Sequence, residues 1–367
     1  MTRQLTEGCE AIAQAMVAAG CRFFSGYPMT PFTEVLEHMS RLLPTVDGIC
    51  MNADSEIEAI GMAWGATSTG TRTATGSVGQ GLSLMQESLA EMSRARLPLV
   101  VLNMARGQGD YFQATRGGGH GDYTHIVLAP ADVQEAVDLV GDAFNLADRW
   151  RTPVIVIGDY YLAHTQQAVE IPAIDKESHP SKPWALDGST GGSGNARFLS
   201  PLTPNKRSDP EFVTHGGWLE ALADVMDEIE TGVEQRVDSF ETEDAELVVV
   251  AYGTPARYLR AVVEELRSEG IPVGIIRPVT LSPFPAAAIS AVADRVRGVA
   301  VFELNRGQML VDVQLAVSGN CPVTFIGGVS FDRSGFGIAP VLEIETLKAK
   351  VRACFEQCHI AMESKSR

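Results

Sequence analysis

Short apolar runs alternate with longer amphipathic segments through the first part of the chain. The apolar runs occupy residues 21–25, 48–52, 72–78, 98–104, 125–130 and 153–159, and helical periodicity covers 7–20, 32–43, 55–67, 82–96 and 131–150. This alternation is typical of βαβ units, whose strands are buried on both faces of a parallel sheet. The pattern predicts one doubly wound α/β domain over residues 1–162.

The alternation stops after this domain. Proline and charged residues are frequent between 163 and 243, and residues 188–194 read GSTGGSG. Such a stretch predicts an extended connection that passes over a surface or a partner. The alternation resumes with AELVVVAYG, so we expect a smaller α/β domain over 244–367 whose last helix lies around 347–358.

The composition adds limits on partners and compartment. A formal net charge of −17 over 367 residues, without any run of Lys or Arg, argues against nucleic-acid binding. The first residues lack an apolar signal core, and no stretch reaches about 18 apolar residues, so we expect a cytoplasmic protein without a membrane span. The six cysteines form no CxxC pair, which is typical of free thiols, and an iron–sulfur cluster takes four thiolates. Any such cluster would belong to another chain.

Ligands of open parallel sheets gather at the carboxyl ends of the strands, so the residues that follow each predicted strand are the candidates. The first group is GYPMTP, in which Thr30 precedes Pro31 where a helix is expected to start. Thr30 is either an N-cap with proline at the first helical position, or a hydroxyl that holds a substrate carboxylate together with the helix N-terminus.

The second group is NADSEIEAIG. Ser55 and Glu58 have the spacing of a capping box, so we interpret Glu58 as structural. Glu56 stands at the first helical position, where the helix dipole favours a carboxylate. The sequence alone leaves both a structural and a functional role open for Glu56.

Two glycine-rich segments complete the candidates. GSVGQGLSLM is neither GxGxxG in a first βα turn nor a GK[ST] loop, so its glycines permit a tight turn or the close approach of a flat ligand. The long loop ARGQGDYFQATRGGGHGDYTH carries Arg106, Arg116 and His120. Arg106 is either surface charge or faces the same crevice as Thr30. No metal-ligand cluster and no GxSxG elbow is present, so we predict neither a metal site nor a serine hydrolase.

These segments together resemble the α subunits of the 2-oxoacid:ferredoxin oxidoreductases, which include 2-oxoglutarate, branched-chain 2-oxoacid and pyruvate enzymes. GYPMTP is similar to the family's Gly-Tyr-Pro-Ile-Thr-Pro, and SEIEAIGMAWGAT, GLSLMQE and GDYFQATRGGGHGDYTHIVLAP also match. The resemblance continues through VVAYGTPAR, IIRPVTLSPFP and FELNRGQM. It implies a pyrimidine-type thiamine diphosphate domain, doubly wound around a parallel sheet, followed by a transketolase C-terminal-like α/β domain.

The resemblance also implies roles for individual residues. Glu56 matches the carboxylate that contacts the aminopyrimidine ring of thiamine diphosphate, where it favours the imino tautomer that activates the thiazolium carbon. Thr30 and Arg106 match the positions that bind the carboxylate of the 2-oxoacid. Pro28, Gly79 and Gly81 match residues that line the cofactor. The implied reaction is oxidative decarboxylation of a 2-oxoacid with coenzyme A, giving acyl-CoA, CO₂ and reduced ferredoxin, with 2-oxoglutarate or a branched-chain 2-oxoacid favoured.

Partner subunits follow from the same resemblance. The chain has no Gly-Asp-Gly…Asn motif for a diphosphate and its metal, so a β subunit should carry that domain with Mg²⁺. Gamma or delta subunits should carry the iron–sulfur clusters that pass electrons to ferredoxin, and this chain alone should be inactive.

Two departures from the family pattern leave alternatives open. The turn that usually reads Thr-Ser-Gly-Pro-Gly is SVGQG here, and the loop after Arg106 is shorter. The alternatives are a non-oxidative decarboxylase or transketolase-like subunit, and a scaffold subunit without catalysis.

Overall fold

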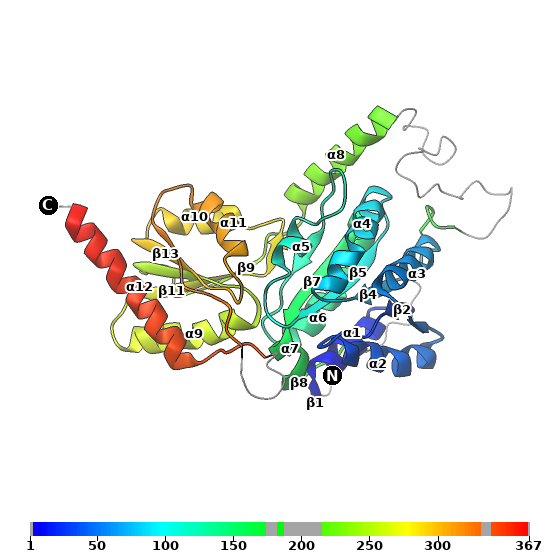
Figure 1. Ribbon diagram of the computed structural model, residues 1–367, viewed down its shortest axis with the longest axis horizontal. Coiled ribbons are helices and arrows are strands. Elements are labelled where there is room, and N and C mark those ends of the chain that lie inside the picture. Colours follow the sequence, from blue (N-terminus) through cyan, green and yellow to red (C-terminus); the bar gives the residue numbers. More distant parts are fainter. Residues whose placement is uncertain (1–2, 174–181, 187–214, 332–338, 366–367) are drawn as a thin grey trace.

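The computed structural model describes residues 3–173, 182–186, 215–331 and 339–365. Two α/β bodies stand side by side, each built around its own sheet (Figure 1). The first sheet has seven strands in the order β12-β6-β7-β5-β4-β2-β3, and the second has five in the order β14-β13-β10-β11-β9. The predicted fold class, a doubly wound parallel-sheet domain followed by a smaller α/β domain, is confirmed. The GSTGGSG stretch lies outside the described residues.

Six strands of the first sheet run parallel, as the apolar runs predict. They are β2 (Phe23–Gly26), β3 (Ile49–Asn52), β4 (Thr73–Gly76), β5 (Leu99–Ala105), β6 (Ile126–Leu128) and β7 (Pro153–Asp159). All seven residues of β5 and of β7 are buried. Valine, isoleucine and leucine dominate both strands because each is covered on its two faces.

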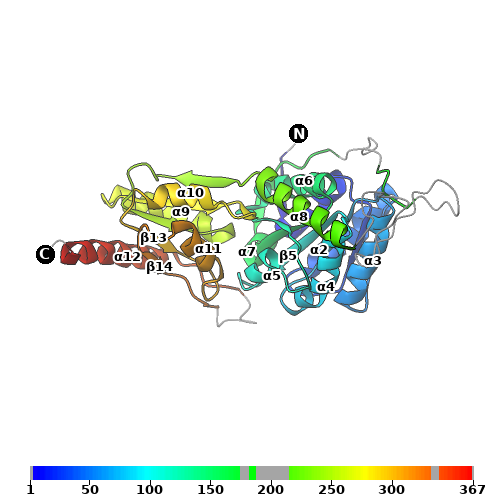
Figure 2. The same ribbon diagram turned by 90° about the horizontal axis from the view of Figure 1, so that it is seen from above.

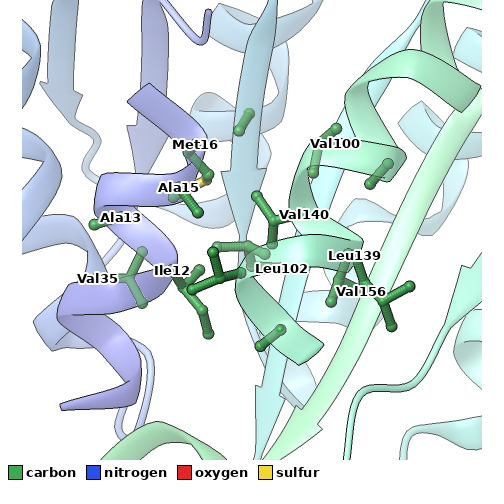
Figure 3. Packing of buried hydrophobic residues seen from close by; sticks show 14 of the residues in the cluster. Ile12, Ala13, Ala15, Met16, Val35, Val100, Leu102, Leu139, Val140 and Val156 are labelled. Carbon is green, nitrogen blue, oxygen red and sulfur yellow. The ribbon is translucent and has the colours of Figure 1, made fainter. Parts of the chain in front are cut away.

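Helices cover both faces of this sheet. They are α1 (Gly8–Ala18), α2 (Thr33–Leu42), α3 (Glu56–Ser68), α4 (Gln80–Arg94), α5 (Tyr111–Thr115), α6 (Val133–Trp150) and α7 (Tyr160–His164), with a 3₁₀ turn η1 (Leu43–Val46) after α2. On one face, Ile12 and Met16 of α1 pack toward Val140 of α6 and Leu102 of β5 (Figure 3). Apolar residues recur on α6 at helical spacing, so this helix buries one side against the strands, whereas nine of the eleven residues of α1 are buried.

The second sheet contains β9 (Val237–Phe240), β10 (Leu247–Val250), β11 (Val273–Pro278), β13 (Gly298–Val301) and β14 (Val323–Phe325). Its helices are α9 (Gly253–Ser268), α10 (Ala286–Ala293), α11 (Gln308–Val317) and α12 (Ile344–Lys365). One apolar cluster joins α9 and α12 to one face of the sheet. Another includes Val248 and Val250 of β10 together with Val127 and Tyr111 of the first domain, so the two domains share a core.

Two features depart from the simple division of the chain. The range 163–243, expected as an extended connection, contains β8 (Gln166–Val169), which pairs with β1 (Gln4–Glu7), the helix α8 (His215–Gly232), and β9. Figure 2 shows α8 over the first domain beside α6, and a Cβ atom on Gly232 would lie 2.6 Å from Trp150 of α6. In addition, β12 (Thr280–Ser282) pairs antiparallel with β6 and so belongs to the first sheet although it follows β11.

The helices and the cysteines agree with the composition. Within the described ranges, none of the helices combines the length and the apolar character that crossing a bilayer requires. All six cysteines are free, and Cys9, Cys21, Cys354 and Cys358 are buried.

A buried carboxyl group at the end of β7 makes stability depend on pH. Asp159 is 2% exposed, and its Oδ1 accepts the N–H of Leu162 at 3.0 Å as the N-cap of α7. Burial raises the pKa of Asp159 to about 6. The ordinary pKa is about 3.9, so the folded state binds a proton that the unfolded state has released between about pH 4 and 6. The contribution to stability is therefore largest below pH 4 and is lost as the pH rises through 6.

We predict that Asp159→Asn stabilises the protein more at pH 7.5 than at pH 5, by about 1 kcal/mol, because the amide keeps the cap without a charge. Thermal unfolding at both pH values measures the difference. Asp132→Asn is the matched control, since Asp132 caps α6 but is only partly buried. An equal change at the two pH values would show that ionisation of Asp159 does not affect stability.

Candidate active site

The candidate residues lie at one edge of the first sheet. Strands β5, β4, β2 and β3 are neighbours and parallel, so their carboxyl ends meet at this edge. The segments that leave these ends carry all the residues predicted from the sequence, which are Pro28, Thr30, Glu56, Gly79, Gly81 and Arg106. Pro28 is exposed just after β2.

Helix α3 starts as the capping pattern predicts. The Ser55 hydroxyl accepts the N–H of Glu58 at 3.2 Å, and Glu58 Oε2 accepts the N–H of Asp54 at 3.0 Å. Glu58 is therefore structural. Its reach to residue 54 rather than 55 is a small variation on the reciprocal capping box.

Glu56, the first residue of α3, has a different environment. Its side chain is buried, with the residue 5% exposed, and its Oε1 accepts a hydrogen bond from the Ser77 hydroxyl at 3.3 Å. Among the described residues, no donor lies within hydrogen-bonding distance of Oε2. Because the positive end of the α3 dipole favours a carboxylate at this position, the helix stabilises a buried acceptor that has one free oxygen.

The glycine turn (residues 77–81) presses directly against this carboxylate. A Cβ atom on Gly81 would lie 2.0 Å from Ser77 Oγ and 2.3 Å from Glu56 Oε1, closer than any side chain can come. Gly79, the N-cap of α4, has φ 54° and ψ −117°, and nothing lies within 4 Å of its Cβ position. The glycines thus allow both close packing on Glu56 and an open surface at Gly79.

Two buried polar residues hold the glycine turn in place. The N–H of Gly79 donates to Asp110 Oδ2 at 2.7 Å, and Asn103 Nδ2 donates to the same oxygen at 2.9 Å and to the Ser77 carbonyl at 3.0 Å. Ser77, Asn103 and Asp110 were not predicted as site residues from the sequence. Ser77 directly follows β4, Asn103 lies within β5 and Asp110 precedes α5, and single polar residues at such positions are common.

Thr30 and Arg106 are brought together, although not in the way the sequence suggested. Helix α2 begins at Thr33 with Phe32 at its N-cap, so the expectation of a helix start at Thr30 is wrong. Arg106 Nε instead donates to the Thr30 carbonyl at 3.3 Å, and both residues are exposed. The bond fixes the guanidinium while leaving its terminal nitrogens and the Thr30 hydroxyl free for a ligand.

The other polar residues of the long loop pair elsewhere. Arg116 forms an ion pair with Asp312 of α11 at 2.8 Å. His120 Nδ1 lies 2.9 Å from Glu87, and Nε2 lies 3.5 Å from Glu91. Ligand atoms of these last three residues come within 4.8 Å of one another, the spacing of a possible metal site, but the pairing itself accounts for their positions.

A cleft opens between the two domains beside Arg106. Its volume is about 410 Å³, within the range of about 300–1,000 Å³ that is usual for small-molecule sites. The first domain contributes the glycine turn and the loop after β5, and the second contributes residues 304–308 with Val329 and Phe331.

The second domain fixes the loop after β5 through the side chain of Gln108, which is 3% exposed. Gln108 Nε2 donates to the Tyr252 carbonyl at 3.0 Å, and Oε1 accepts the N–H of Leu304 at 2.9 Å. Asn305 Nδ2 donates to the Gln108 carbonyl at 2.7 Å. The loop that carries Arg106 and Asp110 is therefore held by residues from both domains.

These residues fit the pyrimidine side of thiamine diphosphate. A buried carboxylate with one free oxygen suits the ring nitrogen of an aminopyrimidine, and the open face of Gly79 leaves room for a flat ring beside it. The sequence does not contain the Gly-Asp-Gly…Asn motif that would be expected to hold the diphosphate.

Comparisons with known proteins identify the family to which the sequence belongs. Residues 14–188 match the family model described as pyruvate flavodoxin/ferredoxin oxidoreductase, thiamine diP-bdg, and residues 245–333 match pyruvate:ferredoxin oxidoreductase core domain II. The ketoisovalerate oxidoreductase subunit VorB of Methanothermobacter thermautotrophicus is 37% identical over 86% of this chain and 90% of its own. The 2-oxoglutarate synthase subunit KorA of Methanothermobacter marburgensis is 34% identical over 87% of this chain and 92% of its own.

Solved structures show the same architecture. The 2-oxoglutarate:ferredoxin oxidoreductase from Magnetococcus marinus, with 2-oxoglutarate, coenzyme A and succinyl-CoA bound, aligns with a TM-score of 0.76 and 25% identity. The alignment covers 96% of this chain but only 65% of that one. A split gene transketolase, 14% identical with a TM-score of 0.59, shares the fold.

Fold and matches define an oxidoreductase subunit with a thiamine diphosphate-type domain and a transketolase C-terminal-like domain. The chain belongs to the 2-oxoacid:ferredoxin oxidoreductase family, among its α subunits.

We predict that Gly81→Ala displaces the Glu56 carboxylate, because the added methyl would overlap both Glu56 and Ser77. Binding of thiamine diphosphate to the assembled enzyme, measured by titration calorimetry, should weaken by about tenfold or more. Gly141→Ala on α6 is the control, since nothing lies within 4 Å of that Cβ position. Unchanged cofactor affinity in Gly81→Ala would contradict the contact.

Proposed function

We propose that this chain is the α subunit of an enzyme that oxidatively decarboxylates a 2-oxoacid with coenzyme A. The products would be acyl-CoA, CO₂ and reduced ferredoxin. Support comes from relatives named as ketoisovalerate and 2-oxoglutarate enzyme subunits, and from the solved relative with 2-oxoglutarate, coenzyme A and succinyl-CoA bound. The substrate is 2-oxoglutarate or a branched-chain 2-oxoacid.

The buried Glu56 carboxylate is the observation that carries this proposal. Thiamine diphosphate supplies, when bound, a nucleophilic carbon for the 2-oxo group and a sink for the electrons of decarboxylation. Glu56 would accept a hydrogen bond from the pyrimidine ring with its free oxygen, while Ser77 holds the other oxygen. Pro28, Gly79 and Gly81 would border the ring.

Arg106 and Thr30 would bind the carboxylate of the 2-oxoacid. Two terminal guanidinium nitrogens can grip a carboxylate in a bidentate pair, and the Thr30 hydroxyl can donate a third hydrogen bond. The bond from Arg106 Nε to the Thr30 carbonyl keeps both groups in one orientation before substrate arrives. Positioning of this kind lowers the entropic cost of reaching the reactive geometry.

Partner subunits would complete the enzyme. A β subunit would hold the diphosphate with Mg²⁺, and γ or δ subunits would hold iron–sulfur clusters, because this chain's six cysteines form no CxxC pair. Electrons would leave singly through those clusters to ferredoxin. Relatives named as subunits support an assembly of several chains.

In the complex with its partner subunits, Glu56→Gln should lower the rate of 2-oxoacid-dependent reduction of a one-electron dye by about 100-fold or more. The reason is that a neutral amide cannot favour the imino tautomer of the aminopyrimidine as the carboxylate does. Assembly, followed by size-exclusion chromatography, should be unchanged. Glu58→Gln, on the same helix but exposed, is the control. Unchanged turnover would remove Glu56 from the mechanism.

Analysis of the wild-type complex distinguishes the alternatives. Thiamine diphosphate and iron together, with dye reduction that requires coenzyme A, would support the proposal. Thiamine diphosphate without iron would favour a non-oxidative decarboxylase or transferase, and the absence of both would favour a scaffold.

Arg106→Met should raise the apparent KM for the 2-oxoacid about 10- to 100-fold, with a much smaller effect on the KM for coenzyme A, since a charged partner of the carboxylate is lost. Steady-state kinetics with each substrate varied in turn measures both constants. Arg116→Met, which breaks the pair with Asp312 and removes the guanidinium over the Phe112 ring, is the control. Equal effects on both KM values would contradict a role in carboxylate binding.

A further inference from the structure

In the segment FELNRGQM (residues 302–309), every polar side chain except that of Arg306 has a structural role. Glu303, which is fully buried, accepts the N–H groups of Met309 at 2.7 Å and Leu310 at 2.9 Å and so caps α11. Burial raises the pKa of Glu303, and these donors oppose that rise. The carboxylate thus occupies the helix N-terminus and leaves no place there for an anionic ligand.

Asn305 and Gln308 are also fully engaged. Asn305 Oδ1 accepts the N–H of Gly307 at 2.7 Å, while its amide nitrogen donates to the Gln108 carbonyl. Gln308 Oε1 accepts the N–H of Phe112 at 2.8 Å, and Nε2 donates to the Gly109 carbonyl at 2.8 Å. Both side chains tie the turn to the first domain.

Arg306 lies between Asn305 and Gln308 in the sequence and forms no such hydrogen bond with the described residues. It is exposed and lines the same interdomain cleft as Arg106. Within the described ranges, no carboxylate lies within ion-pair distance of either arginine. Asp110, the acid that also lines the cleft, already accepts from Gly79 and Asn103. Among the described residues, the cleft therefore has two cations without an ion-pair partner, in a chain whose net charge is −17.

The wall beside these cations is apolar. Val329 is 56% exposed and Phe331 is 36% exposed, and both line the same cleft. Two cations beside an apolar wall complement a small molecule with an anionic group at each end and methylene groups between. A substrate with an uncharged tail would occupy the cleft without offering the second guanidinium a partner, and so would lack the charge-assisted hydrogen bonds that a second carboxylate forms.

We infer that Arg306 binds the second carboxylate of a dicarboxylic 2-oxoacid, so that the enzyme selects a substrate of the 2-oxoglutarate type over branched-chain 2-oxoacids. This inference rests on the proposed function, in which Arg106 and Thr30 hold the first carboxylate. Arg306 acts as a specificity-determining residue, since it lines the cleft from the second domain, whereas Glu56 and the glycine turn belong to the first domain.

The test uses the complete complex and compares 2-oxoglutarate with 2-oxoisovalerate. Arg306→Gln should lower kcat/KM for 2-oxoglutarate about 10- to 100-fold, and change kcat/KM for 2-oxoisovalerate about threefold or less. Arg306→Lys should recover part of the loss because it keeps the charge. Arg295→Gln, which breaks an exposed pair with Glu243, is the matched control and should leave the ratio unchanged.

Inhibition by glutarate provides a readout that does not depend on turnover of 2-oxoglutarate. Glutarate should compete with the 2-oxoacid, and Arg306→Gln should weaken its inhibition more than that by butyrate. Equal losses for both 2-oxoacids, no loss for either, or a raised KM for coenzyme A alone would each overturn the inference. Failure of the wild-type complex to turn over any 2-oxoacid would instead refute the proposed function, so the two failures are distinguishable.

Discussion

The buried amide of Gln108 is the contact on which the geometry of the site depends. Its two ends bond to Tyr252 and Leu304 of the second domain, and its own carbonyl accepts from Asn305. Arg106 lies two residues before Gln108 and Asp110 two residues after it. Because Asp110 in turn receives the N–H of Gly79, the second domain fixes the glycine turn as well as the arginine. A satisfied buried network of this kind gives a single well-defined arrangement, since losing any partner would leave a buried polar group without a bond.

Much of the fold could be predicted from the periodicity of the sequence. Strands such as β5 and β7 are uninterrupted apolar runs because the sheet is covered on both sides, and the helices between them keep one apolar face. The periodicity gave no sign of β12, because a three-residue strand is too short to show a period and its partner β6 belongs to the other domain. Helix α8 has apolar residues at helical spacing, but it follows the proline- and glycine-rich stretch and falls inside the range predicted as an extended connection.

The site was harder to predict than the fold. Resemblance to a family supplied Glu56, Thr30 and Arg106, and the residues alone left each with an adequate structural explanation. The helix start predicted at Thr30 was wrong, because the proline that suggested it lies two residues before α2 and not in its first turn. Ser77, Asn103 and Asp110 could not be found from the sequence, since their function comes from contacts between loops that only the fold brings together.

The antiparallel pairing of β12 with β6 has a consequence for how such a chain can be divided in evolution or in the laboratory. A cut placed before the second sheet would expose β6 as an open edge, and unpaired edges are templates for association between molecules. A fusion, a split gene or a chimera of this architecture would therefore keep β6 paired with β12 only if the joint falls after residue 282, inside what the sequence presents as the second domain.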